Sequence, residues 1–289
     1  MSASSPSLPP KVFDRELIAR HFARRQGADD FVTRLALDDL ATRLITVTRS
    51  FEAALIMAPD ARDLPVMGRS ANGSFRFDRA ATVVASEGAA LLEPEALALP
   101  RDDYDLIVSI FDLTVINDVV GFLARVRRHL RPDGLFMAVA IGGASLTELR
   151  EAWLTAEAEV SGGAFARVAP FIPLADAGGL LQRAGFTLPV TDVETHTVRY
   201  GHPLKLMAEL KALGAQNPLA ERPGRPVTRR LLQTATEAYG ALAMDADARV
   251  RATLELIWMS GWAPHESQQK PARRGSATVS LKDVLEKRS

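Results

Sequence analysis

The feature that most constrains the fold is an alternation of short apolar runs with segments of helical periodicity in the middle of the chain. Residues 103–110 (DYDLIVSI) and 135–141 (LFMAVAI) are typical of strands buried on both faces of a parallel sheet. Between them, a helix is predicted by apolar residues at helical spacing, Val119, Phe122, Leu123, Val126 and Leu130. Because parallel strands need crossover connections, the pattern predicts an α/β fold with helices on both faces of a mostly parallel sheet.

Further elements extend this pattern in both directions. Upstream, the periodicity predicts helices over residues 12–26 and 31–44, strands over 53–57 and 81–85, a weaker strand over 75–77 and a loop over 68–73. Downstream, it predicts a turn over 131–134, helices over 145–160, 174–184, 203–213 and 227–244, and strands over 190–200 and 249–258. Ser145 and Glu148 form a capping-box pattern. The last two strands predict an edge hairpin with one antiparallel strand.

The length of 289 residues fits one domain. We expect a disordered lead-in over residues 1–11, one domain over 12–263 with a helical insertion at about 202–245, and a tail over 264–289. The lead-in lacks the apolar segment of a secretory signal, and no apolar run approaches the roughly 18–20 residues of a membrane span. The arginines of residues 15–25 alternate with acids, which favours an ordinary helix over a mitochondrial presequence.

Charge and residue usage exclude several classes of function. Lys plus Arg and Asp plus Glu number 35 each, so nucleic acid is not expected as an electrostatic partner. The chain has no cysteine, which excludes thiolate chemistry and predicts a reducing, cytoplasmic location. Its five histidines lack metal-ligand spacing, so no metal site is expected, and Ser109 and Ser145 lack the context of a hydrolase nucleophile.

Candidate binding residues follow the strands, because ligands of open α/β sheets bind at the carboxyl ends of the strands. The loop after the first strand, residues 58–63 (APDARD), has none of the glycines that allow close backbone approach, and Pro59 lacks an N–H donor. Asp60 is a helix cap, a ligand contact or a plain loop acid. Glu87 either accepts from a ribose or an adenine amine or is solvated. Asn117 or Asp118 can cap the following helix, and for Asn117 a cap is favoured over a ligand contact.

The last stretch, residues 261–277 (GWAPHESQQKPARRGSA), is polar and has no periodicity that folding would require. It is either a surface strap across the sheet or a binding element. Sequence alone leaves both interpretations open.

Several segments together resemble a known family. They are VFDRELIARHFARRQ, DYDLIVSIFDLTVIND, LRPDGLFMAVAIGGASLTELREA, RVAPF, LLQRAGFTLPVTDVETHTVRY and GWAPHESQQKPARRGSA, spread between residues 12 and 279. They resemble class I methyltransferase-fold proteins related to mitochondrial complex I assembly factor 5 and their alphaproteobacterial counterparts. The resemblance implies a Rossmann-like, seven-stranded sheet, or a reduced form of it, and a role in methylation, arginine hydroxylation or scaffolding during assembly.

The resemblance also implies sites. S-adenosylmethionine would lie at the carboxyl ends of the first strands, against Ala58, Asp60, Glu87 and Phe111. A subunit of a respiratory complex would be the partner, bound through the tail at Trp262, His265, Glu266, Gln268 and Gln269. The resemblance places no catalytic side chain.

The chain departs from the family where the cofactor should bind. The family's acid followed by G-x-G-x-G is matched by residues 56–61 (IMAPDA), and the family's His-Trp pair after the fourth strand is matched by Thr114-Val115. We therefore expect a degenerate cofactor motif in a protein that acts on or binds a respiratory-complex subunit. The alternative is an active S-adenosylmethionine-dependent methyltransferase with a small-molecule or protein acceptor.

Overall fold

The computed structural model describes residues 11–25 and 29–269. Its helices are α1 (Arg15–Ala23), α2 (Phe31–Leu44), α3 (Val119–Arg128), α4 (Thr147–Ser161), α5 (Leu174–Arg183), α6 (Pro203–Ala212) and α7 (Arg229–Ala243), with 3-10 turns η1 (Pro94–Ala96) and η2 (Asp112–Thr114). Its strands are β1 (Ala54–Asp60), β2 (Met67–Ser70), β3 (Gly73–Val84), β4 (Ala90–Leu91), β5 (Tyr104–Ile110), β6 (Leu130–Ile141), β7 (Thr187–Tyr200) and β8 (Val250–Trp262). Most of the expected lead-in, and the tail beyond residue 269, lie outside the described residues.

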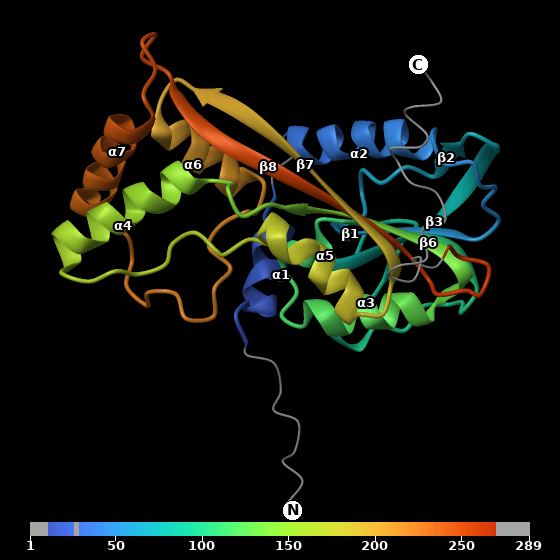
Figure 1. The fold of residues 1–289 in the computed structure, drawn as a ribbon. Coiled ribbons are helices and arrows are strands. Elements are labelled where there is room, and N and C mark those ends of the chain that lie inside the picture. The colour runs from blue at the N-terminus through green and yellow to red at the C-terminus, as the bar shows by residue number, and fades with distance from the viewer. Residues whose placement is uncertain (1–10, 26–28, 270–289) are drawn as a thin grey trace, which may run out of the picture.

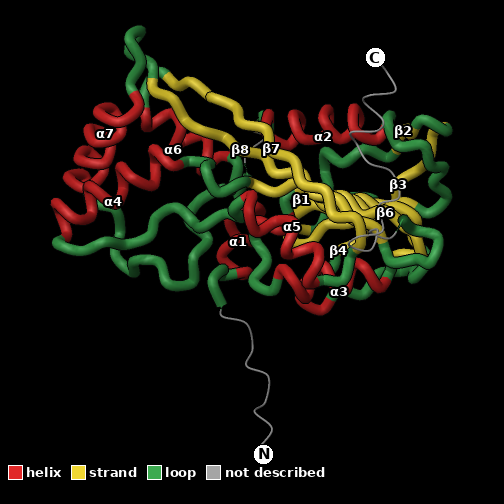
Figure 2. Tube along the Cα trace, viewed as in Figure 1, coloured by secondary structure: helices red, strands yellow, loops and turns green. Residues whose placement is uncertain are grey.

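One sheet runs through the molecule in the order β2-β3-β1-β5-β6-β8-β7, with β4 paired to β3 (Figure 2). The strands β4, β3, β1, β5 and β6 are parallel, whereas β8 is antiparallel to both of its neighbours. This is the Rossmann-like class I methyltransferase fold that the resemblance implied. The sheet has eight strands instead of seven because β2 forms an additional hairpin with β3.

Helices cover both faces of the sheet, as the apolar strand runs require. Helix α2 lies on one face, and α3 and α5 lie on the other (Figure 1). On the α2 side, Leu40 and Leu44 pack against Ile56 and Phe77, and on the other side Phe122 packs with Ile107. Each such fully buried side chain stabilises the fold by about 1.5–3 kcal/mol.

The carboxyl side of the sheet is extended by a long hairpin and three helices. Strand β8 pairs with β6 only from Leu256 onward, and before that residue it pairs with β7 alone. Helices α4, α6 and α7, here called the helical cap, pack against this hairpin around Trp153, Leu206 and Tyr239 (Figure 1). The insertion expected between the last two strands thus contains α6 and α7.

The first crossover differs from expectation. Residues 68–73 were expected to form a loop, but residues 67–70 pair with residues 73–76 as an antiparallel hairpin. Phe75 and Phe77 point inward and Arg76 outward, which is the alternation of a strand with one buried face. Residues 61–66, which follow β1, form no helix, and Pro65 disfavours one there. The chain therefore passes from β1 to the parallel strand β3 without a helix.

Of the two capping predictions, the capping box at Ser145 and Glu148 was wrong, and the cap of α3 was confirmed for one of its two candidate residues. Ser145 and Glu148 do not cap α4: the Ser145 hydroxyl pairs with the backbone of Glu255, and the Glu148 carboxylate accepts from Thr253. Asp118, not Asn117, caps α3 by accepting from the Gly121 N–H at 2.8 Å. Ser145 and Glu148 do not form the capping box because both are bonded to residues of β8.

Candidate functional site

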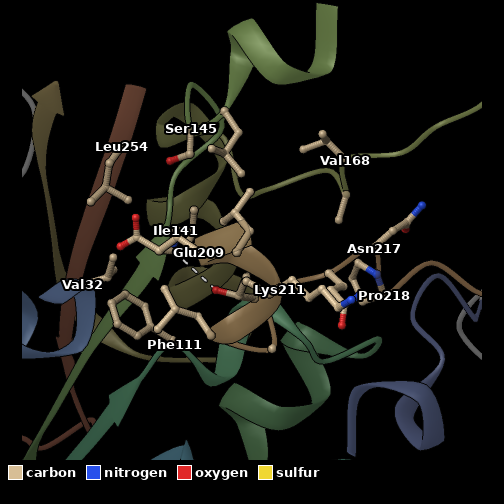
Figure 3. Close-up of a pocket in the computed structure, with 18 of the residues that line it drawn as sticks. Val32, Phe111, Ile141, Ser145, Val168, Glu209, Lys211, Asn217, Pro218 and Leu254 are labelled. Atoms are coloured by element: carbon tan, nitrogen blue, oxygen red, sulfur yellow. Dashed lines mark hydrogen bonds between the residues drawn. The ribbon is translucent and has the colours of Figure 1, made fainter. Parts of the chain in front are cut away.

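A cavity of about 490 Å³ lies where the carboxyl ends of β1, β5 and β6 meet the helical cap (Figure 3). Its walls come from α1, α2, the strand ends, α4, α6 and the loops around residues 167–171 and 213–218. Most of its lining residues are apolar, including Phe22, Phe31, Val32, Phe111, Ile141, Leu149, Trp153, Val168, Leu206, Met207, Leu210 and Leu254. It occupies the place where open α/β sheets bind ligands, and its volume falls within the roughly 300–1,000 Å³ of small-molecule pockets.

At the end of β1 the cavity meets a cluster of polar side chains, here called the Asp60 cluster (Arg25, Asp60, Arg62 and Ser86). The Asp60 carboxylate, 4% exposed, accepts from Arg62 Nε at 2.9 Å, from Arg25 Nη1 at 3.3 Å and from Ser86 Oγ at 3.1 Å. Ser86 Oγ in turn accepts from the Ala61 N–H at 3.1 Å. Burial raises the pKa of Asp60, but hydrogen bonds from Arg62 and Ser86 outweigh it and leave that pKa below its usual value. The bend is thus closed by internal contacts.

The sequence-predicted cofactor residues are only partly brought together. Ala58, Asp60 and Phe111 line the cavity, at the ends of β1 and β5. Glu87 does not line it: the residue is exposed, and its backbone oxygen accepts from Arg79 Nη2 at 3.3 Å. Pro59 lines the cavity beside Asp60, whereas Arg62 folds over the Asp60 carboxylate.

Two bulky residues of the cavity wall have left-handed backbone conformations. Phe111 follows β5 with φ 64° and Leu146 precedes α4 with φ 54°, and both line the cavity. Such conformations cost about 1–3 kcal/mol each in non-glycine residues and cluster at functional sites. Glycine would be the unstrained choice, so their presence points to a role for these side chains in the wall.

Behind Phe111 lies a buried carboxylate. Asp112 is fully buried and accepts hydrogen bonds from Thr82 Oγ1 at 2.5 Å and Ser109 Oγ at 2.7 Å. Burial raises the pKa of Asp112 to about 6, in spite of those hydrogen bonds and the charge of Arg15. Asp112 does not line the cavity, so it supports the strand end instead of contacting a ligand there.

On the cap side, a second cluster holds the loops that close the cavity, here called the Glu157 cluster (Glu157, Arg167 and Arg225). Glu157 of α4 is completely buried, and Arg167 Nε donates to its carboxylate at 2.5 Å, while Arg225 Nη2 lies 3.7 Å away. The Arg167 guanidinium also lies over the Trp153 ring, 5.1 Å from its centroid. One carboxylate thus fastens two loops, around residues 167 and 225, to α4.

These residues do not fit S-adenosylmethionine at the bend after β1. Nucleotide-like ligands there use glycines, free backbone N–H groups and a following helix N-terminus. Here Pro59 lacks the N–H, the Ala61 N–H is already bonded to Ser86, and no helix follows within residues 61–72. The Ala61 N–H and the Asp60 carboxylate of the bend are thus already bonded inside the protein, while the cavity beside them stays open.

The tail residues that were predicted to bind a partner form two groups. Trp262 lies under the Arg49 guanidinium, 5.1 Å from ring centroid to Cζ, and Gln268 accepts from Thr187 Oγ1 at 2.7 Å and donates to Asp133 Oδ1 at 2.9 Å. His265, Glu266 and Gln269 are exposed. Up to residue 269 the tail therefore straps the start of β7 to Asp133 near the start of β6, in the segment 131–134 that was expected to be a turn and belongs to the strand. Its remaining residues lie outside the described part.

Over residues 11–25 and 29–269, no group of three or more His, Asp or Glu side chains is arranged to hold a metal ion. Over the same residues, no helix is both long and apolar enough to cross a bilayer.

Arg25 and the helical-cap residues of the site were not predicted from the sequence. Arg25 reaches Asp60 across 35 positions of the chain, and no local pattern announces such a contact. Gly142, at the end of β6, permits close approach of another group, and a Cβ there would lie 2.3 Å from Glu255 Oε1. The approach it permits is therefore to β8 and not to a ligand.

Comparisons with known proteins identify relatives. The mitochondrial arginine-hydroxylase NDUFAF5 of zebrafish (Danio rerio) is 34% identical to this chain over 194 residues, which are 67% of this chain and 60% of the zebrafish protein. The human NDUFAF5 is 36% identical to this chain over 194 residues, which are 67% of this chain and 56% of the human protein. The malonyl-[acyl-carrier protein] O-methyltransferase of Halorhodospira halophila is 33% identical over 193 residues, 67% of this chain and 63% of its own. The chain thus spans about three fifths of the length of these relatives. No family model matches it.

Solved structures with similar folds were also found. The YcgJ protein of Bacillus subtilis is 13% identical, with a TM-score of 0.45 over 80% of this chain and 99% of that one. Phosphoethanolamine N-methyltransferase 2 of Haemonchus contortus, in complex with S-adenosylhomocysteine, is 10% identical, with a TM-score of 0.41 over 87% of this chain and 57% of that one.

Proposed function

The chain is a class I methyltransferase-fold protein that resembles the arginine-hydroxylase NDUFAF5, and from this premise we propose that it is an assembly factor of that type. In this proposal it binds or acts on a subunit of a respiratory complex and has lost tight binding of S-adenosylmethionine. The observation that carries the loss is the Asp60 cluster, which closes the bend after β1 with internal hydrogen bonds.

The binding free energy that the bend after β1 would lose supports the proposed loss of tight S-adenosylmethionine binding. Each net hydrogen bond to a ligand is worth on the order of 1 kcal/mol, and several backbone contacts are absent at this bend. A loss of a few kcal/mol lowers affinity by two orders of magnitude or more, since about 1.4 kcal/mol is tenfold. A methyl donor held so weakly would not support turnover at ordinary cofactor concentrations.

Titration calorimetry with S-adenosylmethionine and S-adenosylhomocysteine tests the cofactor part. We expect no micromolar binding to the purified chain. Tight binding of either compound would refute a closed bend. Pro59→Gly serves as the matched variant, because it restores one N–H donor without removing the Asp60 cluster.

Capture of respiratory-complex subunits tests the partner part. We expect the intact chain and Pro59→Gly to retain one subunit, and a chain that lacks residues 264–277 to lose it. Equal capture by the shortened chain would remove the tail from the proposal. A chain that captures no subunit at all would contradict the assembly role itself.

An active S-adenosylmethionine-dependent methyltransferase is the second candidate, and the cavity favours it. Its 490 Å³ at the ends of β1, β5 and β6 leaves room for a ligand, and relatives include O-methyltransferases. The acceptor would then be a small molecule or a protein. The calorimetric titration decides between the two candidates.

We also propose a reducing, cytoplasmic compartment for this chain. The absence of cysteine supports it. The similar NDUFAF5 proteins carry mitochondrial names, so fractionation of cells that express a tagged chain is the measurement that checks it.

A further inference from the structure

The sheet ends at a long strand that has a neighbouring strand on one side only. Among the residues that the structure describes, β7 pairs with β8 and with no other strand (Figure 1). Its register with β8 is continuous over residues 190–200. An edge strand of this kind presents a row of backbone N–H and C=O groups with which a strand of another chain can pair.

The contacts of β8 show which backbone groups of β7 point away from the sheet. The Glu255 carbonyl accepts from the Gly142 N–H at 2.8 Å, on the β6 side of β8. Because the backbone groups of successive residues point to opposite sides of a strand, those of Leu256 point toward β7, where Glu194 lies opposite. In this part of β7 the even-numbered residues therefore bond to β8, and the odd-numbered residues direct their N–H and C=O groups outward.

The outward backbone groups in the middle of β7 are open to a partner. Outside the β7–β8 ladder, no described group bonds to the backbone of Thr195 or Thr197, and both residues are exposed. The Val193 N–H donates to the Asp192 side chain at 2.8 Å, which agrees with its outward direction. Proteins commonly protect edge strands with proline or lysine, and residues 190–200 contain neither.

The sequence of this edge is complementary to itself. If two copies of β7 run antiparallel with Thr195 on the two-fold axis, Glu194 of each copy lies opposite His196 of the other, and Thr195 lies opposite Thr195. A carboxylate opposite an imidazole and threonine opposite threonine both stabilise antiparallel strands, whereas like charges in opposite positions destabilise them. An axis at Glu194 would set two carboxylates against each other, and an axis at His196 would set two imidazoles against each other. The side chains therefore select the axis at Thr195.

We propose that β7 pairs with the β7 of a second copy of this chain over residues 191–199 and joins the two sheets into one. At the axis, the N–H and C=O groups of each Thr195 bond to those of the other. Two-fold interfaces of this kind, in which the same surface serves both subunits, are the commonest in soluble oligomers. One pair of edge strands is a small interface, so the dimer should dissociate on dilution. The pairing requires neither a cofactor nor a respiratory-complex subunit, so its test is independent of the proposed function.

Single cysteines test the register, because the chain has no cysteine of its own. In the proposed pairing the two Thr195 Cα atoms lie about 5.5 Å apart, within the roughly 4.4–6.8 Å that a disulfide spans. The two Thr197 Cα atoms lie about 14 Å apart, since they are offset by four residues of strand. Under oxidised glutathione, Thr195→Cys should form a disulfide-linked dimer about tenfold faster than the equally exposed Thr197→Cys, because its thiols are held close together. Equal rates would overturn the pairing about Thr195.

Light scattering over a concentration series tests the dimer without a cross-link. The mass of the unchanged chain should rise from 31.3 kDa toward twice that value. Thr195→Asp sets two carboxylates against each other on the axis and should weaken the dimer about tenfold. Thr197→Asp, on the same edge but away from the axis, should weaken it less, and thermal melts establish that both variants fold. A monomer at every concentration, or a dimer that Thr195→Asp does not weaken, would overturn the proposal.

Discussion

The cavity is bounded by two clusters of the same kind, a buried carboxylate held by two arginines. In the Asp60 cluster one arginine is 11% exposed and the other 52%, and in the Glu157 cluster the corresponding values are 10% and 53%. They differ in what else holds the arginine. Both arginines lie over an aromatic ring, Arg25 over Phe22 and Arg167 over Trp153, but only Arg25 also has a second carboxylate, Asp30, at 2.5 Å. In the Asp60 cluster, the bend after β1 is thus held by an arginine that has two carboxylate partners. In the Glu157 cluster, a single carboxylate holds the two loops around residues 167 and 225.

The largest expected effect comes from the cluster without a second carboxylate. Glu157→Gln keeps the shape of the side chain but leaves the Arg167 guanidinium buried without a counter-charge, which costs about 3–5 kcal/mol in comparable pairs. We expect a loss of that size in the free energy of unfolding, measured by urea denaturation. Glu159→Gln, an exposed residue of the same helix, should change it by less than about 0.5 kcal/mol. If both variants lost a similar amount of unfolding free energy, the effect would come from the charge of the helix and not from the buried pair with Arg167.

The next effect concerns a buried carboxylate that no arginine touches. The pKa of Asp112 is raised to about 6, from an ordinary value of 3.8, because it is buried. A raised pKa means that the folded state holds the proton more tightly than the unfolded state. The stabilisation is thus complete below about pH 3.8 and is lost as pH rises through about 6.

Asp112→Asn removes this dependence. The unfolding free energy of the unchanged chain, relative to the variant, should fall by about 2–3 kcal/mol between pH 4 and pH 7.5, from a pKa difference of about two units at 1.36 kcal/mol each. Denaturation at a series of pH values measures it. A constant difference across that range would show that Thr82 and Ser109 compensate the burial fully.

Asp60→Asn tests whether redundancy protects the bend. The amide oxygen can still accept from Ser86 Oγ and the Arg62 backbone N–H, which both donate to Oδ1, whereas the guanidinium bonds to Oδ2 are lost. Because Arg25 keeps Asp30 and Arg62 is exposed, we expect a loss of only about 1–2 kcal/mol. Because the Asp60 cluster has a second carboxylate and the Glu157 cluster does not, the loss should be smaller than that of Glu157→Gln. Asp63→Asn, an exposed residue of the same loop, is the control. If Asp60→Asn cost more than Glu157→Gln, the second carboxylate would not be compensating.

The two clusters also show which features of the structure could be predicted from the sequence and which could not. The α/β class and most elements follow from apolar periodicity, since buried strands such as β5 and amphipathic helices such as α3 are specified by local pattern. The lack of glycines at residues 58–61 also predicted an altered bend. Neither the Arg25–Asp60 pair nor the two loops joined at Glu157 could be predicted, because each contact closes a long stretch of chain and depends on packed tertiary structure.

Contacts between distant parts of the chain also explain the predictions that were wrong. Ser145 and Glu148 fit a capping box, but the partner they bind, β8, lies more than one hundred residues away. Residues 68–73 contain glycine and polar residues that favour a loop, and yet pairing with β3 makes a strand of residues 67–70. Local propensity is a weak preference that a neighbouring strand readily overrides.

The smallest expected effect concerns the tail, which is held by neutral hydrogen bonds instead of a buried charge. Gln268→Ala removes bonds to Thr187, Asp133 and the Ala263 carbonyl, and since the residue is only partly buried we expect a loss of about 1 kcal/mol in unfolding free energy. Gln269→Ala, exposed and adjacent, should leave stability unchanged. Capture of a respiratory-complex subunit separates the two roles of the tail. A strap predicts that only Gln268→Ala lowers capture, through loosening, whereas a contact surface predicts that Gln269→Ala lowers capture while stability stays constant.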